Sequence, residues 1–406
     1  MKDYNIALLG DGLYTWDGGV DYLSNIAGIL EYVNKNWDDT NINIYLILPK
    51  EFFLFRIFRN IFKIGNHQER IDKTIDVFEA VNKSVKIVYY HKTIKKLYDD
   101  KGKNLEKKLR NIKADICFPV LRASYPNLKT PWIAYIPDLQ EKYLTDLFPE
   151  KELIVRDKLR REQVNNSRFF VATSEAVKSD IEKFYPSKDT IIYAEPFAPV
   201  AVDEFIDTSM VDVDKYNLPE CYFIISNQFW AHKSHETAIR ALKLIVDEGN
   251  EDVYLLITGK MDSDPRNDSY SNQVRNLVNE LGLNNRVRFL GFIPKLDQIE
   301  IIKRSNALIQ PSLFEGDPGG CSVYNANSLC VPSIMTDIPV NLEAKDDPLI
   351  TIYTSKDEYS LKNAMLKYIN VKPNVSTELI KKNSEDKSKI LAKFYMNMIE
   401  DVINKY

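Results

Sequence analysis

Short apolar runs that alternate with longer stretches of helical periodicity constrain the fold of this chain more than any other feature. Such alternation is typical of parallel strands joined by crossover helices. The pattern occurs twice, once in each half of the sequence. Two such sheets in tandem predict an α/β protein with two Rossmann-like domains that face one another across a cleft. The expected strands are Asn5–Leu9, Ile42–Leu48, Val85–Tyr90, Ile116–Pro119, Trp132–Ile136 and Phe169–Ala172, then Tyr222–Ser226, Val253–Thr258, Val287–Leu290, Ala307–Gln310 and Ser333–Thr336.

A polar, weakly periodic segment separates the two halves. Residues Asp203–Pro219 lack a regular apolar pattern and end in proline, so we expect the interdomain connection there. With 406 residues the chain is too long for one ordinary core. We therefore predict an N-terminal domain over residues 1–202, a C-terminal domain over 203–385, and a final helix over 386–406 that packs back on the N-terminal domain.

Composition and charge argue against several classes of protein. Hydrophobic residues make up 44% and charged residues 28% of the chain, as in a soluble globular enzyme. A formal net charge of −4 gives no reason to expect a nucleic-acid partner. The four cysteines form no CxxC motif and no metal-like spacing with the histidines, which favours reduced thiols, no metal and a cytoplasmic protein. The sequence shows no signal-peptide pattern and no apolar run long enough to span a bilayer.

In parallel sheets of this kind ligands bind beyond the carboxyl ends of the strands, so the turns after the strands are the places to search. The first turn, "GDGLYTWDGGVDYLSNIAGIL", holds Gly10, Gly12, Gly18 and Gly19 and runs into a helix. Glycines let the backbone approach an anion, and a helix start offers free N–H groups. The turn departs from GxGxxG, which disfavours a nicotinamide site. A turn that is merely tight explains the glycines equally well.

The corresponding turn of the second half is "IISNQFWAHKSHETAIRALKLI", with Lys233 where a helix begins. An ammonium beside a helix N-terminus suits a diphosphate, because the point charge and the backbone donors act together. The plainer alternative is a solvated lysine on an exposed turn. His232 and His235 are spaced i, i+3, but no third ligand accompanies them, so a metal pair is disfavoured.

The segment "PSLFEGDPGGCSVYNANSLCVPS" places Glu315 directly before a glycine-rich turn that enters a helix. A carboxylate binds sugar hydroxyls well, because its two oxygens accept from neighbouring O–H groups. The Gly319 and Gly320 amides beside it suggest a phosphate cradle, and hence a sugar diphosphate. The alternative is that Glu315 only caps a helix or forms a salt bridge.

Taken together, these turns resemble the GT-B glycosyltransferases, specifically the retaining group called family 4. "DGGVDYLSNIAGIL" resembles the first glycine-rich loop of that family, and "VATSEAVKSDIEKFY" resembles its segment where the last N-domain strand meets a helix. "VRFLGFIP" is similar to the loop around the nucleotide base, and "PSLFEGDPGGCSVYNANSLCVPSIMTDIP" to the Glu-x7-Glu block. The resemblance implies a nucleotide-sugar donor, bound mainly by the second domain, with the acceptor on the first. The donor contacts it implies are Gly18, Gly19, Asn227, Gln228, Gly291, Phe292, Gly319, Gly320, Cys321, Ser322 and Asn325.

The chain departs from the family pattern at three positions. Asn325 stands where the second glutamate belongs, after a loop two residues longer. Lys233 matches the lysine of the Arg-x4-Lys pair, but the uncharged Gln228 stands at the arginine position, which removes one positive charge from the leaving group. In "AYIPDLQEKY", Glu141 replaces the histidine that often follows "DLQ". Asp138 is the candidate for acceptor contact or proton removal, or alternatively an N-cap of the next helix.

The resemblance implies retaining transfer of a sugar from a nucleotide diphosphate sugar to a hydroxyl acceptor, in bacterial surface polysaccharide or glycoconjugate assembly. We assign catalytic roles to Glu315, Lys233 and Asp138 and expect neither a metal nor a cofactor. Lys233 and the glycine amides would stabilise the departing charge, and Glu315 would position the donor sugar. The alternatives are an inactive GT-B scaffold or chaperone subunit, which Gln228 and Asn325 favour, and a GT-B nucleotide-sugar epimerase.

A basic amphipathic segment bears on the choice of acceptor. "EFFLFRIFRNIFKIG", residues 51–65, interleaves Phe and Ile with Arg and Lys. Such a helix suits the surface of an anionic membrane, where lipid-linked glycan acceptors are found, at the inner face for a cytoplasmic protein. A helix packed against its own sheet, with its basic residues in water, is the slightly favoured alternative.

Overall fold

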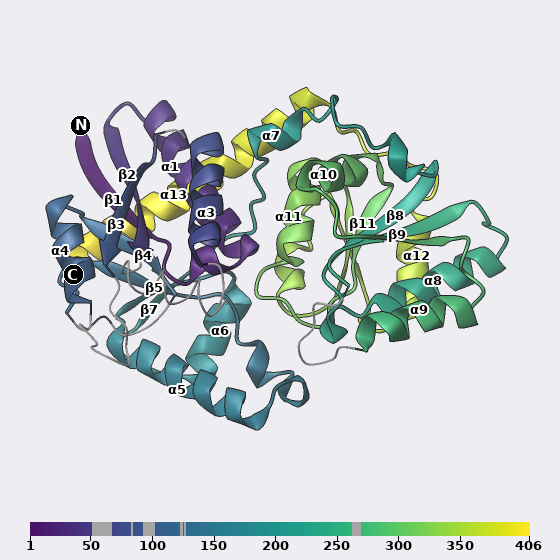
Figure 1. Cartoon of the computed structure of the whole chain (residues 1–406), viewed down its shortest axis with the longest axis horizontal. Helices are drawn as coiled ribbons and strands as arrows, with labels where there is room; N and C mark the ends of the chain where they lie inside the picture. Colours follow the sequence, from purple (N-terminus) through teal and green to yellow (C-terminus); the bar gives the residue numbers. More distant parts are fainter. Residues whose placement is uncertain (51–66, 83, 92–101, 122–124, 126, 262–268) are drawn as a thin grey trace.

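The computed structural model contains two α/β domains that lie side by side (Figure 1). It describes the chain except residues 51–66, 83, 92–101, 122–124, 126 and 262–268. The basic segment proposed for membrane contact, residues 51–65, therefore lies outside the described residues.

Within the described residues the N-terminal domain has a seven-stranded parallel sheet in the order β3-β2-β1-β4-β5-β6-β7. The order reverses direction beside β1, which is the point where ligands bind in such sheets. The strands are β1 Lys2–Leu9, β2 Thr40–Lys50, β3 Lys86–His91, β4 Ile116–Val120, β5 Trp132–Ile136, β6 Phe169–Ala172 and β7 Ile191–Ala194.

The described part of the C-terminal domain has a six-stranded parallel sheet in the order β10-β9-β8-β11-β12-β13. Here the order reverses between β8 and β11, whose carboxyl ends lie next to each other. The strands are β8 Cys221–Ser226, β9 Val253–Thr258, β10 Val287–Gly291, β11 Ala307–Gln310, β12 Ser333–Thr336 and β13 Ile350–Tyr353.

Helices cover both faces of each sheet, because the apolar residues of each strand point alternately to the two sides. In the first domain α1 covers one face and α4, α5 and α6 contribute to the core on the other. The N-domain helices are α1 Asp17–Asn36, α3 His67–Val81, α4 Lys103–Asn111, α5 Glu150–Asn166 and α6 Glu175–Phe184. The later ones are α7 Asp203–Ile206, α8 His235–Asp247, α9 Tyr270–Glu280, α10 Lys295–Arg304, α11 Gly320–Ser328, α12 Glu358–Leu366 and α13 Thr377–Lys405.

The first helix after the glycine-rich turn has an apolar face. Val20, Leu23, Ile26, Ala27 and Leu30 recur at helical spacing; all five are buried, and the last four belong to the core shared with β1. Their burial fixes α1 directly after the glycine-rich turn, so the start of the helix lies at the carboxyl end of β1.

The C-terminal helix α13 crosses from the second domain to the first (Figure 1). Its buried residues, from Leu391 to Val402, belong to the same core as β1 and α1. The Glu400 carboxylate accepts hydrogen bonds from the Lys2 ammonium and the Tyr4 hydroxyl, at 2.7 and 2.8 Å. The last part of the chain is therefore a structural part of the N-terminal domain.

The predicted fold class is confirmed, because the chain forms two Rossmann-like domains, each with a parallel sheet. Two strands are additional, β7 and β13, so β6 is not the last strand of the first domain as "VATSEAVKSDIEKFY" had indicated. The segment 203–219 is not a bare connection, because Ile206 and Val213 pack into the core of the second domain. Within the described residues, no helix combines the length and apolarity that crossing a bilayer requires.

Candidate active site between the domains

The Lys233 ammonium and the Glu315 carboxylate form a close ion pair at the edge of the second sheet. Lys233 ends the 3-10 turn after β8, and Glu315 lies in the loop after β11, the adjacent strand. The Lys233 Nζ to Glu315 Oε1 distance is 2.5 Å, and the two side chains are 13% and 10% exposed. The solvated-lysine alternative is therefore wrong, whereas the alternative of a salt-bridging Glu315 describes this contact correctly.

A buried amide network holds Glu315 in place. Gln310, the last residue of β11, donates through Nε2 to Glu315 Oε1 at 2.8 Å and to the Gly319 carbonyl at 2.6 Å. Its Oε1 accepts from Asn227 Nδ2 at 2.5 Å, and Asn227 Oδ1 accepts from the Ser322 hydroxyl at 3.3 Å. The network thus connects the β8 turn to the start of α11. The hydrogen bond from Gln310 and the ion pair with Lys233 both involve Glu315 Oε1 and not Oε2.

Fewer glycine N–H groups are available to bind an anion than the sequence indicated. The Gly319 N–H donates to Asn341 Oδ1 at 2.8 Å, the Gly320 N–H to the Asp317 carbonyl at 3.2 Å, and the Gly19 N–H to the Trp16 carbonyl at 3.1 Å. A Cβ on Gly19 would lie 2.4 Å from the Leu13 carbonyl oxygen. The tight-turn alternative therefore explains Gly19. The phosphate role of the Gly319 and Gly320 amides requires exchange of existing bonds.

The loop that follows Glu315 also joins the two domains. The Gly316 carbonyl accepts hydrogen bonds from Thr173 Oγ1 at 2.7 Å and from Ser174 Oγ at 2.9 Å, both from the N-terminal domain. A Cβ on Gly316 would lie 2.2 Å from the Pro137 carbonyl oxygen. Glu315 is therefore one residue from a close backbone contact between the domains.

A second contact between the domains involves Glu343. Its two carboxylate oxygens accept from the backbone N–H groups of Ala176 and Glu175, at 2.7 and 3.0 Å. These N–H groups belong to the first turn of α6, where a negative charge is favourable. Burial nevertheless raises the pKa of Glu343, and the two backbone hydrogen bonds act in the opposite direction.

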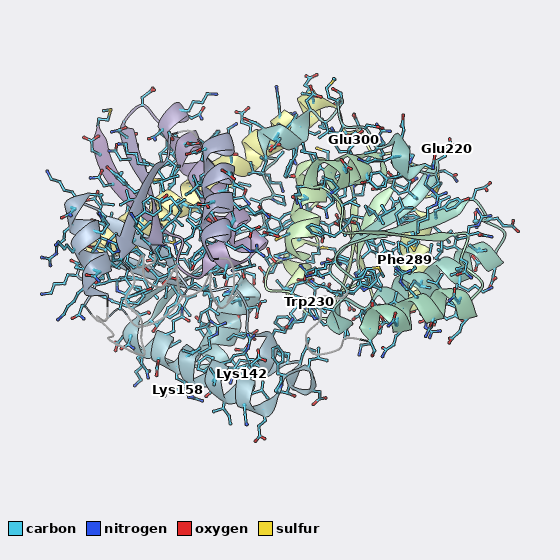
Figure 2. All side chains as sticks on the ribbon, in the orientation of Figure 1. Lys142, Lys158, Glu220, Trp230, Phe289 and Glu300 are labelled. Carbon is cyan, nitrogen blue, oxygen red and sulfur yellow. The ribbon has the colours of Figure 1, made fainter. Side chains whose placement is uncertain are left out.

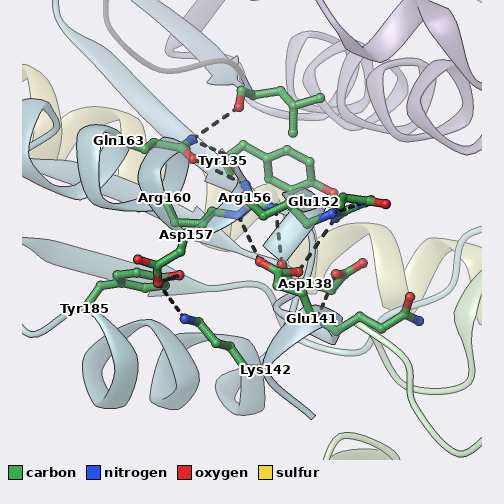
Figure 3. Close-up of polar contacts among 12 residues, drawn as sticks. Tyr135, Asp138, Glu141, Lys142, Glu152, Arg156, Asp157, Arg160, Gln163 and Tyr185 are labelled. Atoms are coloured by element: carbon green, nitrogen blue, oxygen red, sulfur yellow. Dashed lines mark hydrogen bonds and ion pairs between the residues drawn. The ribbon is translucent and has the colours of Figure 1, made fainter. Parts of the chain in front are cut away.

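Asp138 lies on the N-terminal side of the same contact. Its side chain approaches Gly316, whose Cβ would lie 3.1 Å from Asp138 Cβ. Asp138 Oδ1 also accepts from the Gln140 backbone N–H at 3.1 Å, but the N-cap residue of the 3-10 helix Gln140–Lys142 is Leu139 and not Asp138. Figure 3 shows Asp138 beside Glu141, which is buried with Arg156 and Arg160 each 3.7 Å from its oxygens.

The other predicted donor contacts lie at the ends of neighbouring elements of the second domain. Gln228 is exposed in the β8 turn, Phe292 is 78% exposed just beyond β10, and Gly291 has a φ of 69°. Cys321 is exposed near the start of α11, and its Sγ lies 3.5 Å from the Cβ position of Gly18 across the domain boundary. Asn325 lies one turn further along α11 and is half-buried.

Two carboxyl groups that the sequence did not single out share this region. Burial, with the Glu315 charge as the second cause, raises the pKa of Asp317 to about 7, and Lys233 and Asp138 also act on it. Burial raises the pKa of Glu195 to about 7 as well, although Tyr22 donates to its Oε2 at 3.1 Å. Asp317 is thus within electrostatic reach of Glu315, Lys233 and Asp138.

The Glu195 pKa predicts how stability depends on pH. The unfolded chain loses this proton near pH 4.5 and the folded chain near pH 7, so ionisation costs the native state stability as pH rises through this window. We expect Glu195→Gln to raise Tm relative to wild type by a few degrees at pH 8. The gain shrinks as pH falls toward 4.5. Thermal unfolding between pH 4.5 and 8.5 measures this difference.

A matched control is Glu400→Gln on α13. The Lys2 and Tyr4 hydrogen bonds lower the pKa of Glu400, so its contribution has the opposite sign. We expect this variant to lose stability at neutral pH, with a loss that disappears in acid. If the difference in Tm between Glu195→Gln and wild type were the same at every pH, Glu195 would have the pKa of an exposed carboxylate.

His235, one of the two histidines spaced i, i+3, has a structural role. His235 is fully buried, stacks on the Phe229 ring at 4.5 Å, and places Nδ1 3.3 Å from the Tyr270 hydroxyl. Burial lowers its pKa to about 3, so it is neutral at physiological pH. Among the residues that the structure describes, no group of three or more His, Cys, Asp or Glu side chains is arranged to hold a metal ion.

The comparison with protein families concerns the second domain. Residues 212–385 match the family model described as "Glycosyl transferases group 1". The matched range contains the Lys233–Glu315 pair, the Gln310 network and α11. No curated protein sequence matches the chain at a significant level.

Solved structures resemble the chain along its whole length. A glycosyltransferase from Rickettsia africae ESF-5 has a TM-score of 0.64 at 13% identity, with 100% of both chains covered. Sucrose-phosphate synthase from Thermosynechococcus elongatus has a TM-score of 0.63 at 14% identity, covering 99% of this chain and 100% of that one. Anabaena HepE in complex with UDP-glucose has a TM-score of 0.60 at 14% identity, covering 98% and 99%. At these identities the likeness establishes the fold, which is GT-B, and together with the family match it supports glycosyl transfer.

Proposed function

We propose that this protein transfers a sugar from a nucleotide diphosphate sugar to a hydroxyl acceptor with retention, as one member of family 4. The observation that carries the proposal is the Lys233–Glu315 pair, positioned beyond adjacent parallel strands beside the contact with the other domain. A cation and a carboxylate within one hydrogen bond of each other suit a ligand that has a charged leaving group next to a hydroxylated ring.

The Lys233–Glu315 contact also indicates how the donor would bind. The donor diphosphate replaces Glu315 as the partner of the Lys233 ammonium, and the Glu315 carboxylate turns to the sugar hydroxyls. Since Gln310 and Asn227 already support the pair through buried hydrogen bonds, little reorganisation is required. In this proposal the exposed Phe292 and the half-buried Asn325 contact the nucleoside, and Ser322 lies near the phosphates.

The proton of the acceptor hydroxyl goes to the departing phosphate in this proposal, so the reaction requires neither a protein base nor a metal. Lys233 stabilises the charge that develops on the leaving diphosphate, the kind of contribution worth about 3–4 kcal/mol for one group. Asp138 orients the acceptor from the N-terminal side, and contact between the domains at Gly316 excludes water from the donor. The donor is a substrate, and no cofactor takes part.

The acceptor belongs to the assembly of a bacterial surface polysaccharide or glycoconjugate in this proposal, as a glycan or a lipid-linked glycan. One feature supports it: Asp138 lies on the N-terminal side of the contact between the domains, beside Gly316. A carboxylate at this position is suited to a saccharide, because its oxygens accept from hydroxyl groups.

Thermal unfolding with a panel of UDP-, GDP- and other nucleotide sugars tests donor binding. We expect one base to raise Tm by several degrees, because a ligand at about 100 times its Kd stabilises the native state by about 2.7 kcal/mol. Release of the nucleoside diphosphate then tests turnover, and NMR of the product tests retention. Binding without turnover across acceptors would favour the inactive scaffold, and no binding to any nucleotide sugar would overturn the proposal.

A further inference from the structure

The loop of Glu315 carries a second carboxyl group, that of Asp317. Gly316 separates the two acidic residues, and Glu315 holds the Lys233 ammonium. The loop is tightly folded in front of α11: the Gly320 N–H donates to the Asp317 carbonyl at 3.2 Å, and the Cβ position of Gly320 lies 3.0 Å from Glu315 Oε2. Both carboxyl groups therefore belong to the short stretch that the proposed donor sugar would contact.

A third carboxyl group approaches this loop from the N-terminal domain. Asp138 Cβ lies 3.1 Å from the Cβ position of Gly316, the residue between the two acidic residues of the loop. Burial is the largest cause of the raised pKa of Asp317. The Glu315 and Asp138 charges raise this pKa further, and the Lys233 charge lowers it. Three carboxyl groups from two domains thus interact at this boundary.

The donor itself would occupy the cation of the site. In the proposed complex the diphosphate, a dianion, becomes the partner of Lys233, and Gln228 in the same turn adds no charge. Figure 2 shows Trp230 of this turn on the side of the second domain that faces the first, and Glu220, directly before β8, on the opposite side. The turn therefore points to the other domain, and the sugar meets carboxylates after the diphosphate has taken the ammonium.

Lys295 is a further cation of this region, but carboxylates oppose it as well. It is the first residue of α10, and its charge reaches the Cys321 thiol at the start of α11. Burial is the largest cause of the raised pKa of this thiol. The charges of Asp317, Asp21 and Glu315 raise it further, and Lys295 acts in the opposite direction. The second lysine therefore leaves the balance on the sugar side negative.

We infer that the site takes a nucleotide sugar whose sugar is uncharged and rejects the corresponding uronic acid, and that Asp317 sets this preference. The inference rests on the proposed function and names the class of sugar that the donor carries. A sugar hydroxyl donates hydrogen bonds to carboxylates, whereas a uronate adds a negative charge beside them while Lys233 is engaged by the diphosphate. Selectivity of this kind comes from repulsion of the wrong ligand.

The protonation of Asp317 makes the preference depend on pH. With a pKa of about 7, this carboxyl group is mostly ionised at pH 8.5 and mostly protonated at pH 6. A uronate stays ionised over this range, because a carboxyl group in water ionises near pH ~4. Rejection of the uronic acid is therefore expected to weaken as the pH falls from 8.5 to 6.

Other titratable groups also face Asp317 from the elements around it. Besides Glu315, Lys233 and Asp138, they are Glu195, Cys321, Tyr135 and Tyr324. Burial raises the pKa of the thiol and of both phenols, so these three stay protonated from pH 6 to pH 8.5. Glu195, whose pKa burial raises to about 7, titrates in the same window and requires a control.

Binding of matched nucleotide sugars to the full chain tests the inference. The pairs are UDP-glucose with UDP-glucuronate, UDP-galactose with UDP-galacturonate, and GDP-mannose with GDP-mannuronate, whose members differ only at C6. Where the nucleotide-sugar panel identifies another base, the pair with that base is used. Isothermal titration calorimetry gives the ratio of the two Kd values. We expect the neutral member to bind at least about tenfold more tightly at pH 8.5, and the ratio to fall at pH 6.

Asp317→Asn is expected to bring the ratio at pH 8.5 toward one and to remove its dependence on pH, since an amide does not ionise. Glu195→Gln is the matched control, because it removes the other carboxyl group that titrates near pH 7. We expect this control to keep the preference and most of its pH dependence. The pH series on the wild-type chain tests the inference even if a variant does not fold.

Four results would overturn the inference and leave the proposed transfer standing, because a donor is bound in each. They are equal affinity for the two members of a pair, tighter binding of the uronic acid, a wild-type ratio that is the same at both pH values, and a ratio that Asp317→Asn leaves unchanged. Binding of no nucleotide sugar of either kind would overturn the proposed function, and the inference with it.

Discussion

Lys233→Ala is expected to lower kcat for sugar transfer by about 10²–10³-fold, the loss typical of removing one preorganised charge or donor from a developing anion. The effect is expected in kcat more than in KM, because the charge on the diphosphate grows as the sugar bond breaks. Nothing at the Gln228 position replaces the lost charge, since glutamine carries none. Steady-state kinetics with the donor identified by thermal unfolding provides the measurement.

The variant also leaves Glu315 without its cation, which makes a stability control necessary. Lys387→Ala is matched, because Lys387 forms a 2.7 Å ion pair with Asp347 and the side chains are 18% and 9% exposed, similar to the Lys233 pair. We expect both variants to lose stability and only Lys233→Ala to lose kcat. Wild-type turnover in Lys233→Ala would remove the basis for the site. An equal loss of kcat in Lys387→Ala would attribute the effect to folding.

The strands that the sequence did not predict share one physical property. β7 and β13 stand at the edges of their sheets, and residues such as Ile191 and Thr351 are only partly buried. A partly buried edge strand has a weaker apolar signal than a strand that is covered on both faces, although the other two edge strands, β3 and β10, were predicted. β6 and β12, in contrast, are fully buried, and their predicted bounds agree with the structure.

The predictable part of the site was the part set by topology. Lys233 and Glu315 follow strands that are adjacent in the sheet, so a position in the sequence implied a position in space. The supporting residues could not be predicted in this way. Gln310 looks like a strand residue, and Asn341 reaches Gly319 across 22 positions. Such partners depend on loop geometry, which carries no periodic signal.

The same limitation explains why the sequence overestimated the glycine N–H groups as donors to an anion. Glycines in a turn before a helix indicate close backbone approach, but the approaching group can belong to the chain itself. At Gly19 it is the Leu13 carbonyl, and at Gly316 it is the Pro137 carbonyl of the other domain. The second case gives a glycine of the candidate loop a role in assembling the domains, which no pattern in the sequence indicated.

Gly316→Val is therefore expected to lower kcat/KM about 100-fold or more while the donor still binds. Any Cβ at this position meets the Pro137 carbonyl oxygen at 2.2 Å, a backbone atom that side-chain rotation cannot relieve. The N-terminal domain has to move away, and Thr173 and Ser174 lose their acceptor. Misplacement of reacting groups by about 1 Å costs about 10²-fold in rate. Kinetics, the donor-induced rise in Tm and the radius of gyration from solution scattering measure the three consequences.

Gly28→Ala is the matched control, because this glycine lies inside α1 and the nearest atom to its Cβ position is Asn82 Nδ2 at 3.7 Å. An alanine there is expected to leave kcat/KM unchanged and to stabilise α1 by up to about 1 kcal/mol. If Gly316→Val retained the wild-type kcat/KM and radius of gyration, the backbone contact at Pro137 would not be part of the active arrangement. Loss of donor binding in Gly316→Val would instead indicate that the substitution disrupts the Glu315 loop itself, because the proposed donor contacts lie mainly within the second domain.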